Sequence, residues 1–213
     1  MIWILAAITG YLLGSIPSAV WIGKLWHNID IRQHGSGNAG ATNVFRVLGK
    51  KSGIVVLSMD ILKGAAAALF PSLLVRIFDA DMNPEQLAYL GILGGVSAVL
   101  GHLYPVFAQF KGGKGVATML GIMLALQWWP TWVSVLGFVL VWISFSYISL
   151  ASISGGLLFP LAYFLLTKER SLPMDIVACI LPLLLLYTHR ANIRKLLAGT
   201  ENKMYPFKRK KEK

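Results

Sequence analysis

The sequence predicts an all-α integral membrane protein, a polytopic bundle of about seven transmembrane helices. Three observations indicate this fold class. Hydrophobic residues make up 56% of the 213 residues, charged residues only 14%, and the mean hydropathy is +0.64. The apolar residues form runs near the ~20 residues that a helix needs to cross a bilayer. The net charge of +11 gathers between these runs, as in membrane loops.

The expected elements follow from the apolar runs. The predicted spans are 2–25, 53–77, 87–107, 116–129, two within 130–167, and 175–187. The first should be kinked, because Gly14 and Pro17 lie inside it. It lacks a charged start and a cleavage motif, so it is expected to be a retained helix. The run 130–167 divides best at 144–152, where serines collect. We expect one domain over 1–203 and a basic tail over 204–213.

The distribution of lysine and arginine predicts the sidedness of the helices. With seven spans, only Arg76, Lys168 and Arg170 fall in loops on one side, and Lys63 lies within a span. The remaining basic residues lie on the other side, which places the N-terminus outside and the C-terminus in the cytoplasm. A layout of five spans with two re-entrant segments gives the same sidedness. The basic residues follow membrane loops and lack a reading module, so a nucleic-acid binder is disfavoured.

The glycine-rich segment 110–118 is the strongest functional signal. Glycine lets backbone N–H groups approach a ligand, and lysine adds positive charge. Such a segment before a helix starting near Val116 predicts a phosphate cradle. A Walker A loop is disfavoured, because Gly115 follows Lys114 and Ala108 replaces the first glycine. A basic hairpin that only holds orientation remains an alternative. The candidate phosphate-binding residues here are Gly112, Gly113, Lys114 and Gly115.

A second polar block covers 30–46 and is rich in small residues and amides. Arginine offers a planar fork suited to phosphate. If a helix begins near Gly40, Asn43 and Arg46 share one face. The alternative is a glycine and asparagine turn with a solvated arginine. The candidate phosphate-binding residues of this block are Ser36, Gly37, Asn38, Thr42, Asn43 and Arg46.

A third block follows the last span. His189 and Asn192 lie at i, i+3, so they share a helix face, where a histidine could act as a base or orient a hydroxyl. A plain interfacial histidine is the alternative. Ser149 and Ser152 lie at the expected break between two spans. They would add to the phosphate site or simply mark the helix break.

Ionisable residues within or near spans need a partner or a cavity. Asp60 and Lys63 lie at i, i+3 within the second span, which allows an ion pair. Alternatively, Lys63 reaches the anion site. His102, near the end of the third span, either binds an anion or makes structural hydrogen bonds.

Together these motifs resemble the bacterial acyl-phosphate:glycerol-3-phosphate acyltransferases. The resemblance extends from about residue 10 to 201, and the block 144–152 matches less distinctly. The longer basic tail is the main departure from the family pattern. The matching motifs, in order, are 14–18, 35–43 with Arg46, 60–64, 101–118, and His189 with Asn192.

The resemblance implies a multi-pass enzyme of the bacterial inner membrane, with its active site facing the cytoplasm. It would move a fatty acyl group from acyl phosphate to the 1-hydroxyl of glycerol 3-phosphate, giving lysophosphatidic acid and phosphate. No metal or cofactor is implied, and we expect a monomer. It assigns catalysis to Ser36 and Arg46, glycerol 3-phosphate binding to the glycine loop, supporting roles to His189 and Asn192, and a structural role to Glu201.

The chemistry of two phosphorylated substrates suits these residues. Arg46, Lys114 and loop N–H groups are the candidates for holding both anions, and Lys114 is a candidate catalytic residue. The general base is either His189 or a phosphate oxygen of the substrate, with Ser36 orienting it. A transporter or channel for a phosphorylated solute is the rival function. It is disfavoured because the outer halves of the spans are almost wholly apolar, which leaves no polar path.

Overall fold

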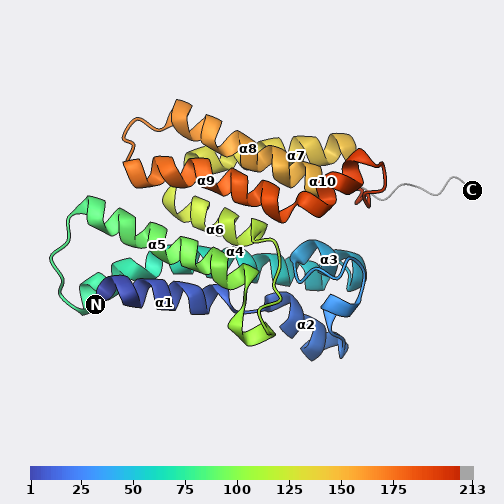
Figure 1. The fold of residues 1–213 in the computed structure, drawn as a ribbon, viewed down its shortest axis with the longest axis horizontal. Helices are drawn as coiled ribbons and strands as arrows, with labels where there is room; N and C mark the ends of the chain where they lie inside the picture. The colour runs from blue at the N-terminus through green and yellow to red at the C-terminus, as the bar shows by residue number, and fades with distance from the viewer. Residues whose placement is uncertain (207–213) are drawn as a thin grey trace, which may run out of the picture. The chain divides into compact units, whose positions relative to one another are not determined.

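The computed structural model describes residues 1–206, which form helices and no β-strand (Figure 1). The all-helical prediction is therefore confirmed. The chain divides into two compact units, Met1–Leu126 and the chain from Gln127 onward. The single domain expected over 1–203 stays a prediction. Residues 207–213 of the expected basic tail lie outside the described residues.

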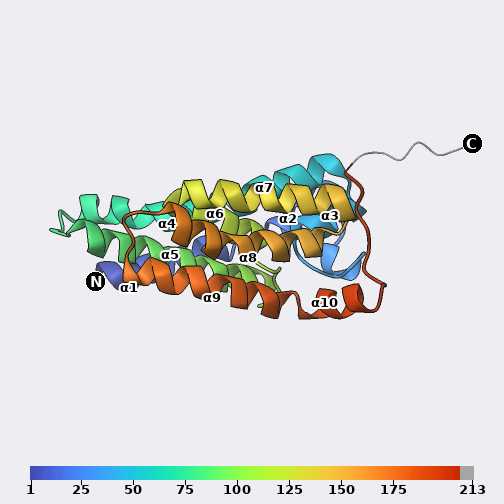
Figure 2. The same ribbon diagram turned by 90° about the horizontal axis from the view of Figure 1, so that it is seen from above.

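Unit 1 is organised around its longest helix, α4. Helix α4 contacts α1, α5 and α6 along its length and α3 near its start (Figures 1 and 2). Helices α1 and α5 also pack against each other. The elements of unit 1 are α1 (Ile2–Gly14), α2 (Ser18–His27), η1 (Ile31–Gln33), α3 (Ala41–Val47), α4 (Lys50–Ile77), α5 (Pro84–Leu103), η2 (Val106–Ala108) and α6 (Val116–Leu126).

Glycines allow these helices to approach at backbone distance. A Cβ on Gly10 of α1 would overlap the backbone of Gly94 in α5, and one on Gly121 of α6 would overlap the carbonyl of Ile61 in α4. Small residues are common where membrane helices pack, because close backbone contact supplies the van der Waals attraction that lipid cannot. The close packing of the helices of unit 1 therefore depends on glycine at these contact positions.

The first predicted span is broken, as expected. Helix α1 ends at Gly14, Ser15 follows as its cap, and α2 begins at Ser18, directly after Pro17. Proline has no N–H and interrupts the helical ladder, so backbone carbonyls near the break need other donors. The carbonyl of Ile16 accepts a bond from the Lys63 side chain in α4. The break is thus held by the helix beside it.

Unit 2 is a smaller helical bundle in which α8 contacts α7, α9 and α10 (Figure 2). The segment after α10 returns to the end of α7, where Met204 N donates to the Ser146 carbonyl and Trp142 Nε1 donates to the Met204 carbonyl. The helices of unit 2 are α7 (Trp128–Phe145), α8 (Ile148–Leu166), α9 (Leu172–Thr188) and α10 (Arg190–Leu197).

The helices support the prediction of a membrane protein, but they do not establish the predicted number of spans. Within residues 1–206, five segments are long and apolar enough to cross a membrane, and six if α9 and α10, bent by 61°, form one span. The break between α7 and α8 lies within the range 144–152, where the sequence predicts a division. Helix α6 has 11 residues and rises about 16 Å, against a hydrocarbon core of about 30 Å. Seven spans and the sidedness stay predictions.

The close approach of α1 and α5 gives a stability prediction. We expect Gly10→Ala to lower the free energy of unfolding by about 1–3 kcal/mol, because the new methyl group meets the Gly94 backbone, which cannot rotate away. Thermal unfolding of the purified protein in detergent measures the change.

The matched control is Gly137→Ala in α7, where the new Cβ meets only the Leu158 side chain. That side chain can move, and alanine is the better helix former, so stability should hold or rise. Equal losses at both positions would contradict the packing explanation.

Candidate active site

The loop before α3 is shaped by Asn43, which is only 2% exposed. Its Nδ2 donates to the carbonyls of Ile31 (3.1 Å) and His34 (2.9 Å), and its Oδ1 accepts from Ser36 N (2.9 Å). Gly35 has φ +62°, and a Cβ there would collide with the Asn43 amide. The Asn43 amide therefore fixes the backbone that presents Ser36.

The predicted phosphate ligands of this block occupy different environments. Ser36 and Gly37 are exposed, while Asn38, Thr42 and Arg46 are half-buried. Both amide hydrogens of Asn43 are already donated within the loop, so binding phosphate through Nδ2 would break one of these bonds. The expected helix is present as α3, but Asn43 points inward. Phosphate binding by this block stays a prediction.

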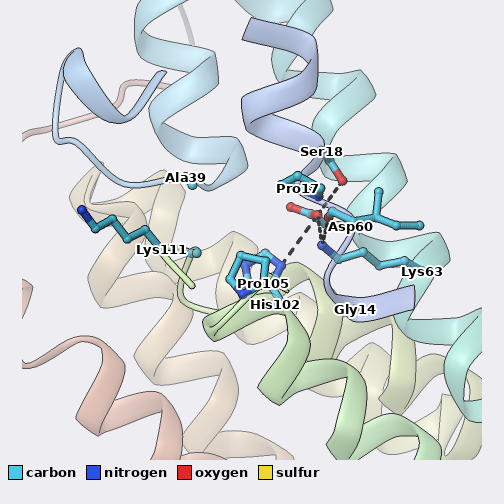
Figure 3. Close-up of a pocket in the computed structure, with 12 residues that line it drawn as sticks. Gly14, Pro17, Ser18, Ala39, Asp60, Lys63, His102, Pro105 and Lys111 are labelled. Carbon is cyan, nitrogen blue, oxygen red and sulfur yellow. Dashed lines mark hydrogen bonds and ion pairs between the residues drawn. The ribbon is translucent and has the colours of Figure 1, made fainter. Parts of the chain in front are cut away.

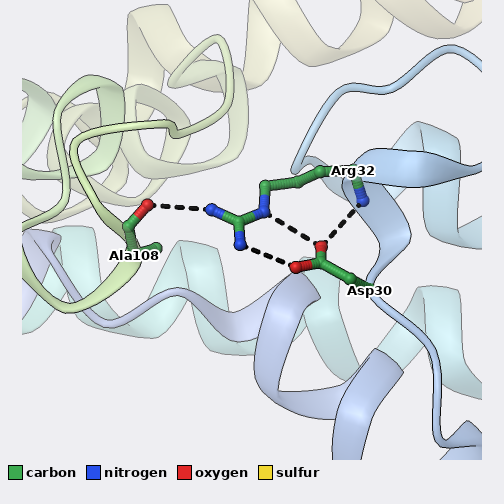
Figure 4. A network of polar contacts seen from close by, with 3 residues as sticks. All are labelled: Asp30, Arg32 and Ala108. Atoms are coloured by element: carbon green, nitrogen blue, oxygen red, sulfur yellow. Dashed lines mark hydrogen bonds and ion pairs between the residues drawn. The ribbon is translucent and has the colours of Figure 1, made fainter.

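Arg32 joins this loop to the start of the glycine loop (Figure 4). It forms a bidentate ion pair with Asp30, with Nη2 donating to Oδ2 at 2.6 Å and Nε donating to Oδ1 at 2.9 Å. Its Nη1 donates to the Ala108 carbonyl of η2 at 2.9 Å. The sequence does not predict a role for this pair. Its only sequence signal is an acid and a base two residues apart.

The glycine loop packs against α5 more closely than an open cradle would. Gly112 N donates to the Leu103 carbonyl and Gly113 N to the His102 carbonyl, each at 3.2 Å. A Cβ on Gly112 would overlap the His102 carbonyl, and one on Gly113 would overlap His102 Nε2. These two N–H groups face the protein, whereas the sequence predicts that they face a phosphate. Their binding role stays a prediction.

The rest of the loop leads into α6. Gly115 has φ +81°, which favours glycine, and its carbonyl accepts the N–H of Met119. Helix α6 then begins at Val116, as predicted. Lys114 is half-buried immediately before it. A lysine here adds charge beside the positive end of a helix, which suits a site for an anion.

A buried polar cluster lies beneath this loop (Figure 3). One oxygen of Asp60, Oδ1, is 2.8 Å from Lys63 Nζ and 3.0 Å from the Ser18 hydroxyl. His102 Nδ1 lies 3.7 Å from the same oxygen and 3.1 Å from the Thr118 hydroxyl. Lys63 also donates to the Ile16 carbonyl at 2.8 Å. The ion pair that i, i+3 spacing allows is therefore formed.

A small recess borders this cluster. The glycine loop forms one wall with Lys111, Gly112 and Gly113, and the helix break forms another. Figure 3 shows Lys111 extending away from the Asp60 carboxylate. The recess thus joins two segments that are far apart in sequence: the glycine loop, which was expected to be functional, and the helix break, which was expected only to be a kink.

Unit 2 contains a second polar cluster, centred on Glu201. Ser149 Oγ and Asn192 Nδ2 both donate to Glu201 Oε1, each at 2.8 Å. Ser152 Oγ donates to the Ile148 carbonyl of its own helix. Both serines are buried, and their hydroxyl hydrogens point to protein acceptors. Phosphate binding by Ser149 or Ser152 would require these hydroxyls to rotate, and it stays a prediction.

His189 is 2% exposed at the junction of α9 and α10. Its Nδ1 lies 2.9 Å from the Leu185 carbonyl. A carbonyl can only accept, so Nδ1 bears the hydrogen, and the neutral ring has its lone pair on Nε2. This tautomer could accept a hydrogen bond or a proton through Nε2. Whether His189 and Asn192 join the residues of unit 1 stays a prediction.

The comparison with known families decides the classification. A family model described as glycerol-3-phosphate acyltransferase matches residues 4–199. The chain belongs to the glycerol-3-phosphate acyltransferase family. The glycerol-3-phosphate acyltransferase of Enterococcus faecalis is 44% identical over 210 residues, covering 94% of this chain and 91% of the relative. That of Bacillus velezensis is 44% identical over 206 residues, covering 96% and 98%.

Two solved structures also resemble this glycerol-3-phosphate acyltransferase family member. Both are crystal structures of PlsY (YgiH), described as an integral membrane glycerol 3-phosphate acyltransferase, and both are 39% identical over 95% of each chain. The glycerol 3-phosphate form has a TM-score of 0.82 and the lysophosphatidic acid form 0.80. The family resemblance of the motifs is thereby confirmed.

The Asp30–Arg32 pair gives a pH prediction. The Arg32 guanidinium holds the pKa of Asp30 at about 2, below its usual 3.8. The carboxylate therefore stabilises the fold at every pH above about 4, and this contribution disappears as the pH falls from 3.8 to 2. Asp30→Asn should lower the free energy of unfolding by about 1 kcal/mol at pH 7, because solvent screens the pair, and by much less near pH 2.

Thermal unfolding in detergent between pH 2 and 7 tests this. Asp81→Asn, at an exposed carboxylate after α4, is the control and should change stability by less than about 0.5 kcal/mol. A difference between wild type and Asp30→Asn that persists unchanged at pH 2 would show that the charge is not responsible.

Proposed function

We propose that this chain transfers a fatty acyl group from acyl phosphate to the 1-hydroxyl of glycerol 3-phosphate. The products are 1-acylglycerol 3-phosphate (lysophosphatidic acid) and inorganic phosphate. The main support is the likeness to PlsY, whose two forms are named for glycerol 3-phosphate and lysophosphatidic acid, the proposed acceptor and product. Acyl phosphate as the donor rests on the resemblance of the motifs to the acyl-phosphate-dependent enzymes.

The proposed reaction makes one ester bond and breaks one anhydride bond. The 1-oxygen of glycerol 3-phosphate attacks the acyl carbonyl carbon, and the bond between that carbon and the phosphate oxygen breaks. The hydroxyl proton passes to a base, and phosphate leaves with the electron pair. Phosphate is a good leaving group, so binding and orientation supply most of the catalysis, worth ~7–11 kcal/mol, and an oxyanion donor adds ~3–4 kcal/mol.

The proposed ligands of the two phosphates are cationic side chains of unit 1. Arg46 offers a planar fork and Lys114 a point charge beside the start of α6. Ser36 supplies a hydroxyl from the loop that Asn43 shapes. Arg32 supports this assignment, because its bond to the Ala108 carbonyl holds the Ser36 loop beside the glycine loop.

The proton of the attacking hydroxyl has two proposed acceptors. One is Nε2 of His189, whose tautomer is set by the Leu185 carbonyl. The other is a phosphate oxygen of the substrate, with Ser36 orienting the acceptor. In the first route the 1-hydroxyl donates its hydrogen to Nε2 of His189, with Asn192 beside it, and in the second it donates that hydrogen to the phosphate oxygen.

The proposed location is the bacterial inner membrane, with the active site facing the cytoplasm and the chain acting as a monomer. The apolar helices support a membrane location. The concentration of lysine and arginine around the Ser36 loop, the glycine loop and α10 supports cytoplasmic exposure of those segments.

The donor assay tests the function directly. Purified protein given palmitoyl phosphate and glycerol 3-phosphate should release inorganic phosphate and form 1-acylglycerol 3-phosphate in equal amounts, because each transfer yields one of each. Palmitoyl-CoA and palmitoyl-acyl carrier protein serve as alternative donors and should give no product.

Activity only with a thioester donor, or no transfer by well-folded protein, would overturn the proposal. The transporter alternative is tested in the same preparation. Vesicles containing the protein should take up no labelled glycerol 3-phosphate in the absence of an acyl donor.

Substitution of His189 tests its proposed role. If His189 takes the proton, His189→Ala should lower kcat at saturating substrate about 10²-fold or more, because the hydroxyl loses its base. Arg46→Lys keeps a positive charge but loses the planar fork, so it should raise KM more than it lowers kcat. Steady-state rates across pH 5–9 separate the two proton routes.

If imidazole takes the proton, the acidic limb of the wild-type kcat profile should vanish in His189→Ala. If phosphate takes it, the limb should persist in His189→Ala. An effect of His189→Ala confined to KM would contradict the histidine route.

A further inference from the structure

One turn of α4 contacts three segments of unit 1. At its start, Asp60 binds the Ser18 hydroxyl of α2. At its end, Gly64 packs so closely on α6 that a Cβ would overlap the Thr118 carbonyl. Between them, Lys63 binds the Ile16 carbonyl at the helix break. This turn, residues 60–64, therefore connects α4 to the break after α1, to α2 and to α6.

The geometry of the Asp60–Lys63 ion pair is constrained by burial and by shared contacts. Asp60 and Lys63 are 2% and 6% exposed in an apolar helix, where an unpaired charge is costly. All of the contacts to Asp60 converge on one oxygen, Oδ1. Moving either side chain would therefore break several contacts together.

His102 connects the pair to the glycine loop by two routes. Its imidazole lies between Asp60 Oδ1 and the Thr118 hydroxyl, and its Nε2 lies where a Cβ of Gly113 would be. Its backbone carbonyl accepts the N–H of Gly113. The loop thus rests directly on a residue whose ring is hydrogen-bonded to Thr118 and packs beside the Asp60 carboxylate (Figure 3).

We propose that Asp60, Lys63 and His102 are positioning residues that set the place of the glycine loop and do not bind phosphate themselves. Lys63 binds the carbonyl at the helix break on one side, Asp60 packs against the His102 ring on the other, and the loop rests on that ring. This inference rests on the proposed role of the loop in binding glycerol 3-phosphate. It differs from the alternative in which Lys63 reaches the anion directly.

The contacts favour positioning over direct binding. The Lys63 ammonium already donates to Asp60 and Ile16, and the adjacent carboxylate offsets its charge. An anion approaching Lys63 would also approach Asp60. The two roles predict opposite effects of removing the Asp60 charge.

The decisive variant is Asp60→Asn. If the pair positions the loop, the KM for glycerol 3-phosphate should rise about tenfold or more, because the loop shifts, while the KM for palmitoyl phosphate changes little. If Lys63 were a phosphate ligand, removing the carboxylate would leave its charge uncompensated, and the KM for glycerol 3-phosphate would fall. Both KM values are measured by phosphate release.

Loss of folding is controlled by a second variant and a matched substitution. Asp60→Leu/Lys63→Met removes both charges and should recover thermal stability relative to Asp60→Asn, since buried pairs are often replaceable by apolar residues. Its KM for glycerol 3-phosphate should stay raised, because the break loses its bond from Lys63 and the His102 ring loses its contact with Asp60. Asp175→Asn removes the charge of a carboxylate that accepts a hydrogen bond from Tyr163 in unit 2 and should leave that KM unchanged.

A stable double variant with the wild-type KM, or a fall in KM for Asp60→Asn, would overturn the inference. Calorimetric titration with glycerol 3-phosphate alone gives the same comparison without an acyl donor. Wild-type protein that binds glycerol 3-phosphate but transfers no acyl group would refute the proposed reaction and leave the positioning test intact.

Discussion

A charged pair in the middle of an apolar helix is the constraint on which unit 1 depends. A charge in a bilayer must be paired or face a cavity, and Asp60 and Lys63 satisfy each other at 2.8 Å. The pair then meets a second requirement of membrane proteins. The Ile16 carbonyl at the proline break after α1 accepts from Ser18 N at 3.0 Å and from the Lys63 ammonium at 2.8 Å. Two features that are costly separately stabilise one another.

Glycine has two different uses in this chain. Between α1 and α5, and between α4 and α6, it allows helices to approach at backbone distance. In the loop before α6, Gly112 and Gly113 permit equally close contact with the end of α5, and their N–H groups bond to α5 carbonyls. An open phosphate cradle and a loop packed against a helix both require glycine. Composition alone therefore does not distinguish the two.

Several residues chosen from the sequence as ligands or catalytic groups have protein partners in the structure. Asn43 holds the Ser36 loop, Ser149 and Asn192 bind Glu201, and Lys63 binds Asp60. Amides, hydroxyls and ammonium groups serve equally well in binding an anion and in building a rigid site, so residue type does not distinguish the two. Arg32 shows the reverse, since its sequence position gave no sign that it reaches Ala108.

The sequence by itself determined the all-helical membrane fold, the break after α1, the division between α7 and α8, the start of α6 and the family. Hydropathy, proline and glycine act locally, and the order of motifs needs no coordinates. Only the tertiary structure decided which groups pair. The i, i+3 spacing permitted the Asp60–Lys63 pair, but Ser18, Ile16 and His102 reach it from distant parts of the chain. Hydrogen bonds depend on distance and direction, which residue spacing fixes only within one helix.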